Sequence, residues 1–124
     1  MNPRTARLCL AAWTTLLVAA LVPWFDVTDH THWMKVTWIP FSPPLRPFDI
    51  LANVLAFIPF GALWRISRFE GLRGRLITAV SLGGGLSLCA EYTQLYSHSR
   101  FPSATDVATN AIGILVGWWW ATRP

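Results

Sequence analysis

The sequence predicts an all-α fold: a four-helix transmembrane bundle that forms one domain over residues 1–124, with the N-terminus and the C-terminus in the cytoplasm. Two features of the composition indicate a membrane protein. Apolar residues make up 53% of the chain and charged residues 13%, against about 25% charged residues in soluble domains. Eight residues are tryptophan, which is enriched where a membrane meets water. The third observation is that the apolar residues fall into four runs of about 20 residues, the length that crosses a bilayer.

The first transmembrane helix is predicted over residues 8–25, after the basic residues Arg4 and Arg7. The same run is also compatible with a signal peptide that has a weak cleavage site at residues 18–20. We favour an uncleaved helix because the run is long enough to span a membrane and because further spans follow. Residues 26–47 then form an extracytoplasmic loop, in which four prolines exclude a continuous helix.

Three further transmembrane helices are predicted over residues 49–66, 76–96 and 104–121. Small residues within them allow close contact between helices, and a proline in the first of the three is expected to kink it. The predicted helix-packing residues are Pro59, Gly61, Gly84, Gly113 and Gly117. Since the spacing of the last two glycines suits either a dimer or contacts within one chain, the sequence leaves the oligomeric state open.

The distribution of basic residues sets the predicted orientation, because positively charged loops remain in the cytoplasm. Four spans place both termini and the loop between the second and third helices on one side. That side carries seven basic residues: Arg4, Arg7, Arg65, Arg68, Arg73, Arg75 and Arg123. The other side carries three: Lys35, Arg46 and Arg100. The first side is therefore predicted to be cytoplasmic, in a multi-pass protein of the cell membrane.

Polar residues interrupt the apolar runs at the outer ends of the last three helices. Each of these helices carries an acid and an amide three or four residues apart, so that both lie on one helix face. An ionisable group within a membrane is costly and is by default a hypothesis of a functional site. We therefore predict a polar cluster in which Arg100 is the ion-pair partner of at least one acid. Its members are Asp49, Asn53, Ser87, Glu91, Gln94, Arg100, Asp106 and Asn110.

Three motifs in this region resemble a known family. Residues 53–61 have the pattern N-x-x-x-F-x-P-x-G, residues 87–94 have S-x-x-x-E-x-x-Q, and residues 100–113 have R-x(5)-D-x-x-x-N-x-x-G. In this order and hydrophobic context they resemble the VanZ-like membrane proteins over about residues 49–117. The resemblance implies a small multi-spanning protein from a family named for resistance to teicoplanin, a glycopeptide antibiotic, without a settled chemical mechanism. Residues 26–47 do not map to the family pattern.

Three functions are compatible with this pattern. The first is action at the outer face of the cytoplasmic membrane, through binding or altered access of a lipophilic glycopeptide antibiotic or a cell-envelope lipid. The second is a membrane-embedded enzyme for a lipid or cell-wall precursor, with Glu91 or Asp106 as general base and Arg100 as ligand of an oxyanion or phosphate. The third is a structural bundle without a ligand. An enzyme is less favoured because no nucleophile is clearly paired with a base.

The expected partners are membrane lipids and a glycopeptide or cell-envelope ligand. Nucleic acid is excluded because the basic residues form no stripe, and no motif implies a cofactor. No metal site is expected. Asp26, Asp29, His30 and His32 are suitable ligand types, but their spacing matches no common zinc pattern.

Overall fold

The protein is all-helical in the part of the chain that the computed structural model describes, which is residues 1–69, 71 and 75–123. The α-helices are α1 (Pro3–Leu21), α2 (Pro47–Ile66), α3 (Leu76–Gln94) and α4 (Ala104–Trp120), and the 3₁₀ helix η1 covers Trp33–Lys35. Within these ranges the only strand-like pairings are two isolated bridges. The predicted all-α fold with four helices is confirmed. Arg73, which entered the orientation argument, lies outside the described residues.

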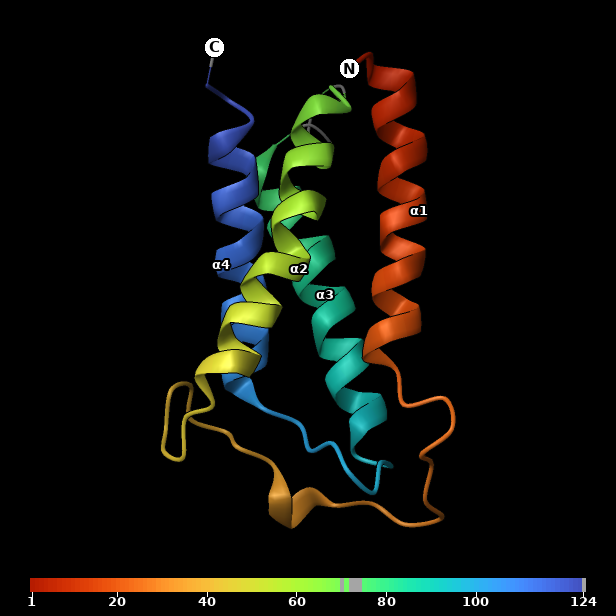
Figure 1. Ribbon diagram of the computed structural model, residues 1–124, viewed down its shortest axis with the longest axis vertical. Coiled ribbons are helices and arrows are strands. Elements are labelled where there is room, and N and C mark those ends of the chain that lie inside the picture. The colour runs from red at the N-terminus through yellow and green to blue at the C-terminus, as the bar shows by residue number, and fades with distance from the viewer. Residues whose placement is uncertain (70, 72–74, 124) are drawn as a thin grey trace.

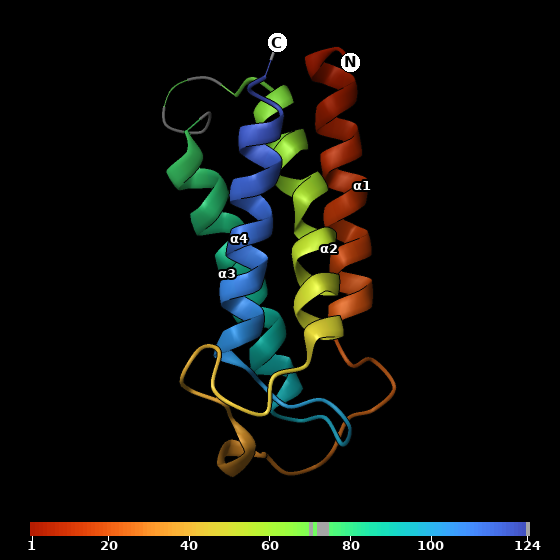
Figure 2. The same cartoon turned by 60° about the vertical axis from the view of Figure 1, so that its left-hand side comes forward.

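The four α-helices run side by side along the long axis of the molecule (Figure 1). Helices α2 and α4 form the most extensive contact, α3 packs mainly on α4, and α1 packs mainly on α2. Both termini lie at one end of the bundle, and the loops that precede α2 and α4 lie at the other end (Figures 1 and 2). This arrangement gathers the ends of all four helices around those two loops.

The first helix differs most from its predicted range, since it begins at residue 3 and not at residue 8. Asn2 caps it, because its side-chain oxygen accepts a hydrogen bond of 2.8 Å from the amide of Thr5. The helix ends before residue 25 because Pro23 disfavours helical angles in Val22, whose φ and ψ are −81° and 131°. The other three helices begin and end within two residues of the prediction.

Besides a buried apolar core, the helices expose many large apolar residues and bury several polar ones, which differs from the usual pattern of a soluble protein. Leu16, Leu55, Leu82 and Trp119 are all more than half exposed. The buried polar residues in the helices are Ser87, Glu91, Gln94, Thr105, Thr109 and Asn110. Two helices, α1 and α2, are long and apolar enough to cross a membrane by length and composition.

Glycines bring α2 and α4 into close contact. A Cβ atom on any of three glycines would meet a main-chain oxygen of the facing helix: Gly61 that of Ile114, Gly113 that of Val54, and Gly117 that of Ile58. Pro59 lies within α2, which continues through it. The prediction for Gly84 was wrong, because its Cβ position faces open space and Gly83 is the glycine that packs against α4. One residue along a helix turns the side-chain direction by about 100°.

Candidate functional site

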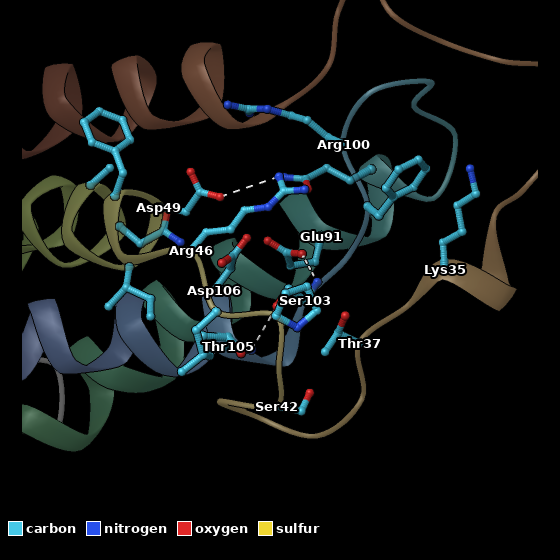
Figure 3. Close-up of a pocket in the computed structure, with 18 of the residues that line it drawn as sticks. Lys35, Thr37, Ser42, Arg46, Asp49, Glu91, Arg100, Ser103, Thr105 and Asp106 are labelled. Carbon is cyan, nitrogen blue, oxygen red and sulfur yellow. Dashed lines mark hydrogen bonds and ion pairs between the residues drawn. The ribbon is translucent and has the colours of Figure 1, made fainter.

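A cavity of about 610 Å³ lies at the end of the bundle opposite the termini. Figure 3 shows most of the residues that line it. Its walls come from the N-terminal ends of α2 and α4, the C-terminal ends of α1 and α3, and the two loops at that end. We call this cavity the polar pocket. Six of the eight residues in the predicted polar cluster line it: Asp49, Asn53, Glu91, Gln94, Arg100 and Asp106.

Three carboxylates from three helices line the polar pocket: Asp49, Glu91 and Asp106. Glu91 on α3 is only 7% exposed, and its Oε2 accepts a hydrogen bond of 2.7 Å from the backbone N–H of Ser103. Asp106 lies in the first turn of α4, beside the amide of Asn53. Figure 3 shows the Glu91 and Asp106 side chains converging on the same space. A hydroxyl or ammonium group in that space would meet two acceptors at once.

Three basic residues line the same pocket: Lys35, Arg46 and Arg100. Arg46, at the start of α2, approaches Asp49 with an Nη1–Oδ2 distance of 3.8 Å. The Nζ of Lys35 lies 4.3 Å from the centre of the Phe101 ring, in a cation–π contact. The polar pocket therefore combines three basic and three acidic side chains, which suits a ligand that carries both an anionic group and hydrogen-bond donors.

The prediction that Arg100 forms an ion pair with an acid was wrong for the described part of the chain. Its Nη1 donates hydrogen bonds to the backbone carbonyls of Ala20 at 3.1 Å and Leu21 at 3.4 Å. Among the described residues, the carboxylate that forms an ion pair with an arginine of the polar pocket is Asp49, and its partner is Arg46. The last carbonyls of α1 lack partners within the helix and carry partial negative charge. They therefore accept hydrogen bonds from the guanidinium of Arg100 in place of a carboxylate.

The two remaining members of the predicted cluster lie deeper, below the polar pocket. The Nδ2 of Asn110 donates a hydrogen bond of 2.7 Å to the Oγ of Ser87, and each residue is 1% exposed. The Oδ1 of Asn110 has no hydrogen-bond partner within the described residues. This pair joins α3 to α4 and forms no part of the pocket lining.

The loop before α2 supplies pocket residues that the sequence did not reveal. Lys35, Thr37 and Ser42 line the pocket because this loop folds back over the start of α4. The backbone N–H of Phe41 donates a hydrogen bond of 2.8 Å to the Oγ1 of Thr105. Thr37 also pairs by main-chain bonds with the residues on either side of Ser103. The prolines and aromatic residues of this loop do not indicate which of its residues lie against α4.

The four residues considered as metal ligands have other partners. The Oδ2 of Asp26 accepts hydrogen bonds from the Oγ of Ser97 at 2.7 Å, and from the N–H at 3.0 Å and Oγ at 2.6 Å of Ser99. These bonds lower the pKa of Asp26 to about 2. Asp29 interacts with the Nδ1 of His30 at 2.8 Å, which lowers the pKa of Asp29. Across the described ranges, no three His, Cys, Asp or Glu side chains are placed to hold a metal ion.

The same bonds bear on catalysis. Ser99 donates its hydroxyl to Asp26 and lies at the edge of the polar pocket, so the two form a serine–carboxylate pair. A carboxylate whose pKa is about 2 is a poor base for removing a proton from a hydroxyl near neutral pH. The hydrogen bonds of Asp26 link the loop before α4 to the residues that follow α1.

Comparison with protein families matches residues 5–123 to the family described as VanZ/LLP1. No curated protein and no solved structure matches the chain. The match covers nearly all 124 residues, including the loop before α2 that the three motifs did not cover. The chain belongs to the VanZ/LLP1 family.

Proposed function

We propose that this VanZ/LLP1 protein is a multi-pass protein of the cytoplasmic membrane whose polar pocket opens to the outer face. There it binds the polar part of an amphipathic ligand, either a lipophilic glycopeptide antibiotic or a cell-envelope lipid. One domain carries this function, with all four α-helices as spans. The observation that carries the proposal is the pocket itself, which holds the motif residues Asn53, Glu91, Arg100 and Asp106 together.

The exposed apolar surface supports a membrane location. Several leucine and tryptophan side chains are exposed on the helices, while six polar side chains of α3 and α4 are buried. Helices of 17 to 20 residues are about 25–30 Å long at 1.5 Å per residue, close to the thickness of the hydrocarbon core. Both termini lie at the end with more arginine, which favours that end as cytoplasmic.

The pocket favours ligand binding over a purely structural bundle. Three acids and three basic residues line a cavity of about 610 Å³, and within the described residues only Arg46 and Asp49 among them form an ion pair with each other. A volume of this order is typical of small-molecule sites. The proposed ligand presents an anionic group to the cations and hydroxyl, amide or amine donors to Glu91 and Asp106.

The function is tested by expression in a glycopeptide-susceptible bacterium. We expect Glu91→Gln, Arg100→Ala and Asp106→Asn to abolish any protection against teicoplanin while membrane levels stay unchanged. Asp29→Asn and Arg4→Ala are matched controls, because both residues are exposed and lie outside the pocket. Loss of protection only in step with protein level would instead assign the cluster a structural role.

The topology is tested by cysteine labelling. In a background with Cys9 and Cys89 changed to alanine, a membrane-impermeant maleimide should label His98→Cys in cells with an intact cytoplasmic membrane. Thr122→Cys should be labelled only after permeabilisation. Labelling of Thr122→Cys but not of His98→Cys in intact cells would reverse the orientation, and labelling of both would contradict four spans.

A further inference from the structure

A second, smaller cavity adjoins the polar pocket. It has a volume of about 340 Å³ and shares two lining residues, Ser99 and Arg100, with the polar pocket. Most of its other lining residues are apolar and come from the end of α1 and the residues that follow: Ala19, Ala20, Val22, Pro23, Trp24 and Phe25. We call it the apolar cavity. The remaining lining residue is Asp26, whose carboxylate accepts hydrogen bonds from Ser97 and Ser99. A polar site and a mainly apolar site therefore meet at Ser99 and Arg100.

Arg100 is held at this boundary from two directions. Its Nη1 is fixed by the carbonyls of Ala20 and Leu21, and its backbone N–H donates a hydrogen bond of 3.0 Å to the Oγ of Ser97. Ser97 is itself held by Asp26. A guanidinium has five N–H donors, and among the described residues its side-chain bonds all come from Nη1. The other donors remain available to an anion.

We propose that the two cavities hold one phosphorylated lipid, with its phosphate on Arg100, its head group in the polar pocket and an acyl or prenyl chain in the apolar cavity. This inference rests on the proposed function of the polar pocket and specifies its ligand. The planar fork of arginine matches the oxygens of a phosphate. Beyond the phosphate, the head group carries hydroxyl or amine donors, which Glu91 and Asp106 accept.

The position of the apolar cavity supports a lipid chain. It lies at the end of α1, one of the two helices that are long and apolar enough to cross a membrane. Ala19 and Ala20 are small and exposed there, while Trp24 and Phe25 are 56% and 103% exposed. Aromatic residues of this kind gather at the level of lipid head groups. A chain in this cavity therefore continues along α1 into the bilayer.

The experiment measures binding to the purified full-length protein in detergent micelles by native mass spectrometry. The probes are dioleoyl phosphatidylglycerol, dioleoylglycerol, which lacks the phosphate, and glycerol phosphate, which lacks the chains. Teicoplanin is included because it also combines an anionic group with an acyl chain. The variants are Arg100→Gln, Arg100→Lys and Ala20→Phe, with Arg4→Gln as the matched control for loss of a positive charge.

We expect Arg100→Gln to weaken the binding of phosphatidylglycerol about tenfold to a hundredfold, because charge-assisted hydrogen bonds are lost. Arg100→Lys should give an intermediate loss, since it keeps the charge without the fork. Ala20→Phe should weaken the binding of phosphatidylglycerol about tenfold by filling the apolar cavity. It should leave the binding of glycerol phosphate unchanged, because the backbone carbonyl of residue 20 can still accept the hydrogen bond from Arg100. Arg4→Gln should change nothing.

The outcomes separate this inference from the proposed function. Equal binding of dioleoylglycerol and phosphatidylglycerol would overturn the phosphate assignment, as would binding of teicoplanin alone with the same dependence on Arg100. The chain assignment is overturned if glycerol phosphate binds through Glu91 and Arg100 and if Ala20→Phe does not weaken the binding of phosphatidylglycerol. The polar pocket would then remain a binding site. If Glu91→Gln alters the binding of no probe, the proposed function itself fails.

Discussion

The contact between α2 and α4 allows a sharp test of the packing. Gly113 is buried in α4, and a Cβ atom there would meet the main-chain oxygen of Val54 and the Cβ of Phe57. Neither atom is the end of a flexible side chain, so Gly113→Ala forces the two helices apart. Overpacking of this kind costs about 1–3 kcal/mol. We expect Gly113→Ala to lower the free energy of unfolding by that amount relative to a glycine-to-alanine change without a clash.

Gly84→Ala is the matched control for this change. It lies within α3, and a Cβ atom at Gly84 meets nothing within 4 Å. Both substitutions gain the same helix propensity, about 0.8–1.0 kcal/mol, so the gain cancels when the two variants are compared. The unfolding free energy is measured by titration of detergent-solubilised protein with sodium dodecyl sulfate, followed by circular dichroism. Values for the two variants that agree within about 0.5 kcal/mol, the usual scatter for changes without a specific mechanism, would refute the close contact.

Three further predictions concern the polar side chains. Asn110→Ala should lower the unfolding free energy in the same titration by about 1 kcal/mol, since it removes a buried hydrogen bond between α3 and α4. Asp26 has a pKa lowered from 3.8 to about 2; its bonds to the serine loop therefore stabilise the fold above about pH 4 and are lost as the pH falls through about 2. Ser97→Ala removes the largest cause of that shift and should raise the carboxyl pKa in an NMR titration, whereas an unchanged pKa would contradict the bond. Thr105→Val should speed hydrogen exchange of the Phe41 amide that it binds, and an unchanged rate would show that other contacts hold the loop.

The sequence predicted the helices and the cluster because both depend on local spacing. Apolar runs of about 20 residues located three helices to within two residues at each end. Acid and amide pairs three or four residues apart marked one face of each helix. Five of these six residues line the polar pocket, and the sixth, Asn110, lies below it. No comparable periodicity exists between residues 26 and 47, so the contribution of Lys35 and Thr37 to the pocket depended on a loop path that only tertiary contacts determine.

The errors have local physical causes. The partner of Arg100 depends on where α1 ends, since only the last carbonyls of a helix are available to a side chain. In a helix that ends at residue 25, the carbonyls of Ala20 and Leu21 would accept hydrogen bonds within the helix. In the structure the last helical residue is Leu21, so these carbonyls are available to Arg100. The choice between Gly83 and Gly84 depends on helix rotation, and three successive glycines give no apolar pattern that would fix it.

The proposed binding site and the contact between α2 and α4 depend on the same two helices. The pocket residues Asn53 and Asp106 lie on α2 and α4, and Val54 and Gly113 form the contact that sets the distance between these helices near the pocket. A larger residue at Gly113 is therefore expected to move Asn53 and Asp106 apart without replacing any side chain of the pocket. A ligand between two opposed walls must contact both of them. Gly113→Ala should therefore weaken the binding of a pocket ligand and also lower the free energy of unfolding. Gly117 lies one turn further from the pocket along α4, so Gly117→Ala should cost similar stability with a smaller loss of binding, and equal losses of binding would show that the whole helix moves as a rigid body.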